Sequence, residues 1–167
     1  MIPAPSGPLN PFSSMTTFIH FIYLFGLVFW IGSILFFSFF TAPVLFKTLD
    51  RSQAGEVIEV LFPRYYGIGY VCAGLILAAL LLNWPALSML KLGIWGVMAA
   101  GTFYTGLAIN PRVRGLKEQM KSARKAADKK PLEARFQSLH SLAVKLNAAV
   151  LLAGLGLLWA TAGGLRL

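Results

Sequence analysis

Five polar residues lie at the borders of long apolar stretches, where their side chains would meet if those stretches form neighbouring helices. They are Arg64, Tyr65, Asn110, His140 and Asn147. Arginine, tyrosine and asparagine supply hydrogen-bond donors and acceptors, and histidine adds a group that binds metals or transfers protons near neutral pH. Such a set can bind a solute or ion at the mouth of a helical bundle, or it can join helices by mutual hydrogen bonds.

The two histidines allow three interpretations of His140. It is an interfacial capping or hydrogen-bonding residue, an axial ligand to haem or another tetrapyrrole, or a proton-handling group. His20 lies near the start of the first apolar stretch, and we expect it at the opposite membrane face. Because a hydrocarbon core is about 30 Å thick, the two cannot share one iron, so a bound tetrapyrrole would have one protein histidine for each metal.

Residue patterns typical of enzymes are missing from the sequence. The apolar stretches contain no Asp or Glu, and the chain has no His or Cys pair at ligand spacing, no glycine-rich phosphate loop and no carboxylate pair. We therefore expect no catalytic residues and no metal site. The lack of a carboxylate within the membrane also argues against a proton-coupled pump.

The composition is that of a membrane protein. Of the 167 residues, 57% are hydrophobic and only 13% are charged. A helix needs about 20 mostly apolar residues to cross a bilayer. We predict an all-α, integral membrane four-helix bundle that forms a single domain over residues 1–167. The predicted spans are about 15–41, 65–83, 87–109 and 137–163.

The positions of the basic residues predict how the chain is oriented. The loops at 42–64 and 110–135 contain 12 of the 15 Lys and Arg residues, three in the first loop and nine in the second. The positive-inside rule therefore predicts that both loops are cytoplasmic and both termini outside, in the cytoplasmic (inner) membrane. The basic segment VRGLKEQMKSARKAADKK has no aromatic residue, so we expect it to attract anionic lipid headgroups and not nucleic acid.

The first of these loops contains DRSQAGEVIEVLF, whose apolar residues recur at helical spacing. We predict a short cytoplasmic amphipathic helix between spans one and two, capped by Asp50 and ended by Pro63. Its acidic residues would be repelled by anionic lipid. We therefore expect Glu56 or Glu59 to face the basic second loop, although a membrane-anchoring helix is the alternative.

One face of the fourth span is expected to point inward, because its members follow a spacing of four and three residues. They are Phe136, His140, Ala143, Asn147, Val150 and Gly154, whereas Lys145 lies elsewhere on the helix and is expected to anchor at lipid headgroups.

Small residues predict the packing faces of the other spans. The predicted faces are Gly26, Trp30, Ser33 and Phe37 on span one, Gly74 and Ala78 on span two, and Gly96 and Ala100 on span three. A two-plus-two repeat is also suggested, because TAPVLF ends the first span and INPRVRG ends the third, each with a proline before a charged loop.

Several phrases resemble the transmembrane protein 205-like family, a group of four-span membrane proteins also catalogued as a domain of unknown function. The phrases are FIHFIYLFG, APVLFKTLD, LFPRYY at 61–66 and FxxLHxxxxxxN at 136–147. Ala143 stands where that family would have a serine. The resemblance implies a fold and a membrane location, and it assigns no catalytic residues.

From these observations we expect a non-enzymatic accessory or assembly protein, or a small subunit of a larger membrane complex, with partner subunits or a second copy in the bilayer. One alternative is a tetrapyrrole-binding redox or energy-transduction subunit that uses His140 or His20. A further alternative is a protein that handles a small solute or metal, with its mouth at Arg64, Asn110 and His140.

Overall fold

The computed structural model describes residues 11–83, 88–123 and 126–163, and their regular structure is entirely helical. Leu87, at the start of the third predicted span, and the basic residues Arg124, Lys125 and Arg166 lie outside the described residues. The elements are α1 (Pro11–Leu35), the π-helical turn η1 (Phe36–Thr41), α2 (Ala42–Thr48), α3 (Arg51–Leu82), α4 (Met89–Tyr104), the π-helical turn η3 (Thr105–Ile109), α5 (Asn110–Ser122) and α6 (Ala126–Ala162).

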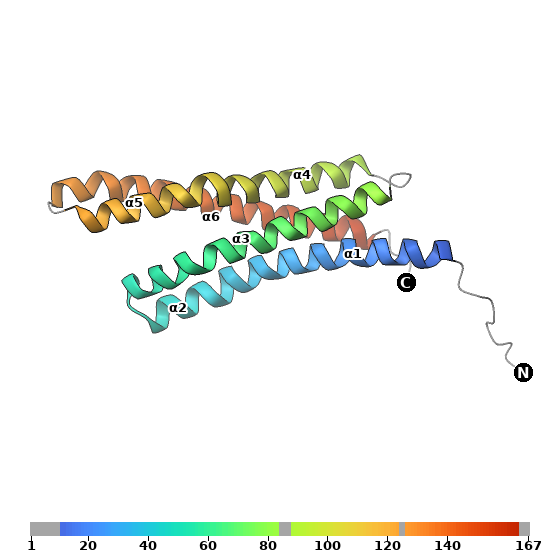
Figure 1. Ribbon diagram of the computed structural model, residues 1–167, viewed down its shortest axis with the longest axis horizontal. Coiled ribbons are helices and arrows are strands. Elements are labelled where there is room, and N and C mark those ends of the chain that lie inside the picture. Colours follow the sequence, from blue (N-terminus) through green and yellow to red (C-terminus); the bar gives the residue numbers. More distant parts are fainter. Residues whose placement is uncertain (1–10, 84–87, 124–125, 164–167) are drawn as a thin grey trace, which may run out of the picture.

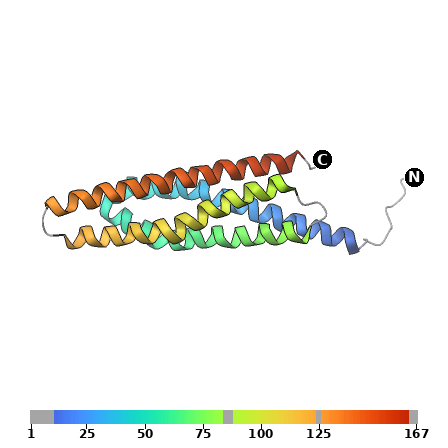
Figure 2. The same cartoon turned by 90° about the horizontal axis from the view of Figure 1, so that it is seen from above.

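These elements form four long rods, because α1, η1 and α2 follow one another without a break, as do α4, η3 and α5 (Figure 1). The described rods that are long and apolar enough to cross a membrane are Ser14–Thr48, Arg51–Leu82, Met89–Ser122 and Ala127–Ala162. The predicted all-α four-helix membrane bundle is therefore confirmed. The rod α1–α2 packs beside α3, and α4–α5 packs beside α6, so the bundle consists of two helical hairpins (Figures 1 and 2).

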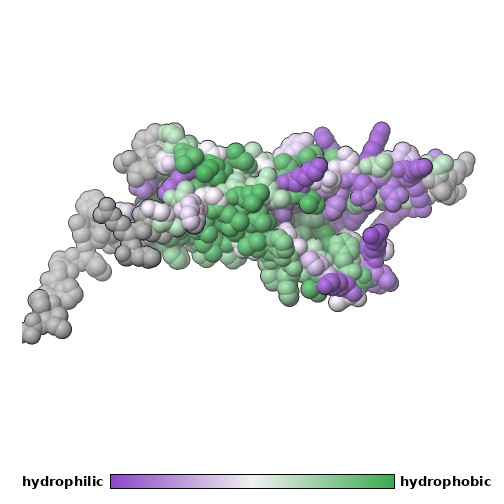
Figure 3. Space-filling model, turned by 180° about the vertical axis from the view of Figure 1, so that it is seen from behind, coloured by the Kyte–Doolittle hydropathy of each residue, from purple (hydrophilic) through white to green (hydrophobic). Residues whose placement is uncertain are grey.

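The rods are longer than a bilayer requires. The 32 residues of α3 span about 48 Å at 1.5 Å per residue, against a hydrocarbon core of about 30 Å. Figure 3 shows hydrophilic side chains gathered at the end of the bundle formed by α2, α5 and the starts of α3 and α6. We call this the charged end, and the opposite end, where α1 begins and α6 finishes, the terminal end. The bundle therefore projects from the membrane at its charged end.

The two hairpins share an unusual feature at matching positions. In each, a π-helical turn ends two residues before a proline. Ala42, before Pro43, donates its N–H to the Phe37 carbonyl, and Asn110, before Pro111, donates to the Thr105 carbonyl. A proline ring clashes with the carbonyl four residues earlier, and a wider turn moves that carbonyl away. Each hairpin also has a proline inside its second helix, at Pro63 and Pro131. These correspondences support the predicted two-plus-two repeat.

The core lies along the middle of the bundle and depends on close approach at four glycines. A Cβ atom at Gly101 would lie 2.7 Å from Val150 Cγ2, and one at Gly154 would lie 3.0 Å from Ile31 Cγ1. Gly26 and Gly69 are similarly crowded, and Trp30 beside Gly69 is almost completely buried. Glycine is required at these positions because a side chain would push the rods apart.

The packing faces predicted for spans two and three are wrong. Gly74, Ala78 and Ala100 are exposed, and a side chain at Gly96 would meet nothing within 4 Å. The rods are apolar on every side, so small residues occur on lipid-facing surfaces as well as on packed ones. On span one the prediction holds for Gly26 and Trp30, which are both buried.

The amphipathic segment is helical, but it does not form a separate short helix. It is the first part of α3, which continues through Pro63 to Leu82. Residues on both sides of the proline are buried, including Ile58 and Tyr66, so packing keeps the two parts aligned. Asp50 occupies the N-cap position of α3, but its side chain makes no capping hydrogen bond.

Candidate functional site

A polar cluster joins three of the four rods near the charged end. Tyr65 on α3 donates its hydroxyl to Asn147 Oδ1 on α6 at 2.5 Å, and Asn147 Nδ2 donates to Ser38 Oγ in η1 at 3.3 Å. The Phe37 ring lies against the Tyr65 ring with centroids 4.7 Å apart. We call Ser38, Tyr65 and Asn147 the polar cluster.

The polar cluster lies within the expected hydrocarbon layer, close to its edge at the charged end. Tyr65 is 17 residues from Leu82 at the end of α3, which is about 26 Å along the helix axis. Asn147 is 15 residues from Ala162 at the end of α6, or about 23 Å. Both distances are slightly shorter than a hydrocarbon core of about 30 Å. Polar side chains at this depth need partners, and the cluster supplies them.

The other three residues predicted to meet at this level are placed differently. Arg64 is exposed and donates from Nη1 to the Val60 carbonyl of its own helix at 3.1 Å. Asn110 lines a groove between α3 and α5. The structure thus brings Tyr65 and Asn147 together and directs Arg64 and Asn110 elsewhere.

His140 is exposed and stacks on the Phe136 ring one turn earlier on α6, with centroids 6.0 Å apart. The predicted inward face of the fourth span holds for Asn147, Val150 and Gly154 but does not extend to His140. That turn is 22 residues from the end of α6 at Ala162, or about 33 Å, so it lies where the rods leave the hydrocarbon layer.

The two histidines are near opposite ends of the bundle, because His20 is exposed on α1 close to the terminal end. Within the described residues, no three His, Cys, Asp or Glu side chains are close enough to hold a metal ion together. Gly154, on the inward face of α6, is in close contact with Ile31 and Met98. The small residues on this face therefore serve helix packing.

Sequence reasoning missed Ser38. The residue stands alone among aromatics in FFSFFT, and a hydroxyl in such an apolar run signals a partner on a neighbouring helix. The sequence also did not predict the hydrogen bond between Tyr23 and Thr161 Oγ1, which joins α1 to α6 near the terminal end at 3.0 Å. Both contacts depend on how the rods are rotated about their axes.

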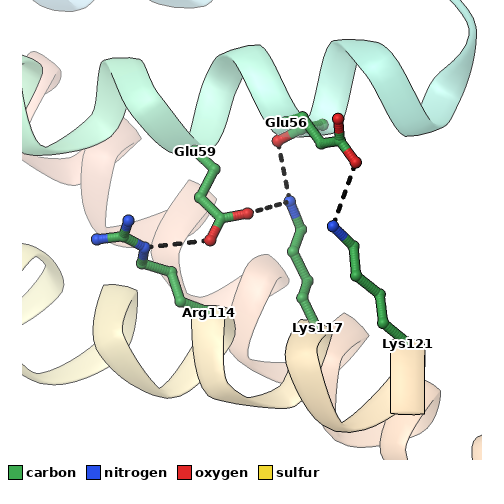
Figure 4. Close-up of polar contacts among 6 residues, drawn as sticks. Glu56, Glu59, Arg114, Lys117 and Lys121 are labelled. Carbon is green, nitrogen blue, oxygen red and sulfur yellow. Dashed lines mark hydrogen bonds and ion pairs between the residues drawn. The ribbon is translucent and has the colours of Figure 1, made fainter. Parts of the chain in front are cut away.

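A layer of ion pairs holds α3 against α5 outside the polar cluster (Figure 4). Glu59 pairs with Arg114 at 3.2 Å and with Lys117 at 3.7 Å, and Glu56 pairs with Lys121 at 3.2 Å. Lys117 also donates to the Gly55 carbonyl at 3.1 Å. The expectation that Glu56 or Glu59 faces the basic second loop is therefore confirmed for both residues.

The sequence matches the family described as a domain of unknown function, DUF4149, over residues 25–122. It is also similar to an uncharacterized protein of Aquifex aeolicus (strain VF5), with 35% identity over 131 residues that cover 78% of this chain and 86% of the relative. No solved structure gives a significant match. These findings agree with a membrane family of unknown function. They do not identify the chain as a member of the transmembrane protein 205-like family.

Proposed function

The chain belongs to the DUF4149 family of unknown function, and we propose that it is a non-enzymatic accessory or assembly protein that acts as a small subunit of a larger membrane complex. We further propose a relationship to the transmembrane protein 205-like family, which is supported by LFPRYY and by FxxLHxxxxxxN. The observation that carries the proposed function is the uncovered face of α6.

The fourth rod is covered least by the rest of the bundle. Only 17% of the residues in its most apolar stretch are buried inside the bundle, against 28–39% in the other three rods. Its exposed face combines small residues with large ones at helical spacing, namely Ala148, Ala149, Leu152, Leu155, Gly156 and Trp159. Small residues let a second helix approach closely in lipid, and the large ones fit the grooves of such a helix.

The exposed face of α1 is different. It carries a ladder of phenylalanine rings, in which Phe21, Phe25 and Phe29 stack on one another with centroids 5.6–5.9 Å apart. A continuous ring surface keeps another helix backbone at a distance, so this face suits lipid. The contrast between the two faces supports α6 as the side that receives a partner.

The polar groups inside the bundle support a structural role for that interior. Among the described residues, every buried side-chain nitrogen or oxygen has a hydrogen-bond partner. In the polar cluster, for example, Asn147 uses both ends of its amide to hold two other rods. Groups engaged in this way stabilise the bundle, which leaves the outer surfaces for interactions with other molecules.

The orientation that we propose places the charged end in the cytoplasm and both termini outside, in the cytoplasmic membrane. It is supported by the 12 basic residues in the two loops at the charged end. A partner subunit would then meet α6 within the bilayer, while the ion-paired layer remains accessible from the cytoplasm.

Photocrosslinking in native membranes tests the proposed function. A benzophenone amino acid replaces Leu152 on the exposed face of α6 or, as a matched control, the exposed Phe25 on α1. We expect a discrete protein adduct from position 152 and none from position 25. Adducts with lipid alone at position 152, or equal protein adducts at both positions, would refute the proposal. Co-expression of two differently tagged copies distinguishes a partner subunit from a second copy of this chain.

A further inference from the structure

A groove lies between α3 and α5, and none of the three residues of the polar cluster lines it. Its volume is about 480 Å³. Residues from both helices and from η3 line it, among them Tyr70, Leu107, Asn110, Arg114, Gly115 and Glu118. We call it the α3–α5 groove.

Two glycines shape the α3–α5 groove. At Gly106 a side chain would collide with the Tyr70 hydroxyl and with Tyr66, so the two rods touch there. At Gly115 a side chain would meet nothing within 4 Å, so the groove is open at that level. The groove is thus narrow at Gly106, on the membrane side, and wide at Gly115, toward the charged end.

The lining changes from apolar to charged along the membrane normal. Lys91 marks the far boundary of the third rod, and a hydrocarbon core of about 30 Å ends about 20 residues later, near Pro111. Leu107, which is 63% exposed, is therefore within the hydrocarbon layer. Asn110 is at its edge, and Arg114 and Glu118 are outside it, one helical turn apart.

The two charged residues of the groove, Arg114 and Glu118, can bind groups of opposite charge. Arg114 donates from Nε to Glu59, and its guanidinium has four further N–H donors that suit a phosphate (Figure 4). Glu118, about 6 Å further along the helix, takes no part in the three ion pairs of this layer, so its carboxylate is available to a cation.

From the membrane outward, the groove presents first the apolar side chain of Leu107 and then the amide of Asn110. The cation of Arg114 and the anion of Glu118 follow. A phospholipid with an ethanolamine head has the same order of groups: acyl chains, glycerol esters, phosphate and a terminal ammonium. We propose that the α3–α5 groove binds phosphatidylethanolamine. Its acyl chains lie along Leu107 and Tyr70, its phosphate accepts hydrogen bonds from Arg114, and its ammonium donates to Glu118.

The same lining discriminates against other phospholipids. Phosphatidylglycerol offers no cation to Glu118, and its negative charge would be repelled by that carboxylate. Phosphatidylcholine carries a quaternary ammonium, which has no N–H to donate and is too bulky to approach the carboxylate as closely. This inference is independent of the accessory role proposed above, because it concerns a different face of the bundle.

Native mass spectrometry of the purified full-length protein tests the inference. Phosphatidylethanolamine, phosphatidylglycerol and phosphatidylcholine with identical acyl chains compete at equal concentration. We expect phosphatidylethanolamine to be retained preferentially. Gly115→Leu fills the open part of the groove and should reduce its retention about tenfold, a change equivalent to about 1.4 kcal/mol. Gly32→Leu is the matched control, because Gly32 is exposed on α1 with nothing within 4 Å and lines no part of the groove.

A second variant tests the headgroup assignment. Glu118→Gln should reduce phosphatidylethanolamine retention to the level of phosphatidylcholine, whereas Glu133→Gln, at an exposed glutamate on α6, should leave the preference unchanged. Equal retention by Gly115→Leu and Gly32→Leu would overturn the proposal, as would a wild-type preference for phosphatidylglycerol or no preference at all. Displacement by water-soluble glycerophosphoethanolamine would overturn the part that assigns the acyl chains to the groove.

Discussion

The hydrogen bond between Tyr65 and Asn147 makes a measurable prediction about how the rods are held together. Tyr65→Phe removes only the hydroxyl and keeps the ring that packs on Phe37. Asn147→Leu removes both the acceptor for Tyr65 and the donor to Ser38. Hydrogen bonds between membrane helices contribute about 0.6 kcal/mol on average and up to about 1.7 kcal/mol. We therefore expect a loss of about 0.5–1.5 kcal/mol for Tyr65→Phe and about 1–3 kcal/mol for Asn147→Leu.

The double mutant separates the shared contact from the other effects of each substitution. Its coupling energy should be about 0.6–1.7 kcal/mol, measured by unfolding the purified protein in mixed micelles with a denaturing detergent and following helicity. Tyr104→Phe is the matched control, because Tyr104 is half exposed on α4 and should not couple to Asn147→Leu. A coupling energy between Tyr65 and Asn147 no larger than that of the control pair would refute the structural role of the polar cluster.

Three further predictions concern the ion pairs, the glycine contacts and the orientation. Glu59→Gln should lower the free energy of unfolding by about 1 kcal/mol at low salt, and by less at 1 M salt, because these partly exposed pairs are screened; equal losses at both salt concentrations would argue against it. Gly101→Ala should cost about 1–3 kcal/mol by overpacking against Val150, whereas Gly74→Ala should not destabilise the protein, and similar losses for both would contradict the packing. In intact cells, a membrane-impermeant maleimide should label Ala162→Cys and not Lys129→Cys, and the reverse result would invert the proposed orientation.

The π-helical turns before Pro43 and Pro111 contribute side chains to the polar cluster and to the α3–α5 groove. Pro43 and Pro111 each follow a π-helical turn, and the polar cluster and the α3–α5 groove each include a residue from one of those turns, Ser38 in η1 and Leu107 in η3. A π-helical turn rotates the side chains that follow it relative to a regular α-helix. In this protein the irregular turns thus place side chains at both features near the charged end.

The sequence by itself determined the features that depend on the composition and spacing of single segments. Four apolar stretches of sufficient length predicted four spanning helices, since backbone groups in lipid must be satisfied within each segment. The acidic residues in GEVIEV and the basic residues in NPRVRGLKEQMK predicted that Glu56 or Glu59 faces the second loop, because opposite charges in water-exposed loops on the same side attract one another. The individual ion-pair partners came from the structure.

Only the tertiary structure decided which faces of spans two and three point inward. In a soluble protein, polar residues mark the outer face of a helix, but lipid is as apolar as a protein interior, so that signal is weak here. For this reason Gly74 and Gly96 looked as suitable for packing as Gly69 and Gly101, which are the glycines in close contact. The partnership of Ser38 with Asn147 also required the structure, because the π-helical turn in η1 changes the direction of its side chain and no periodicity in the sequence records that rotation.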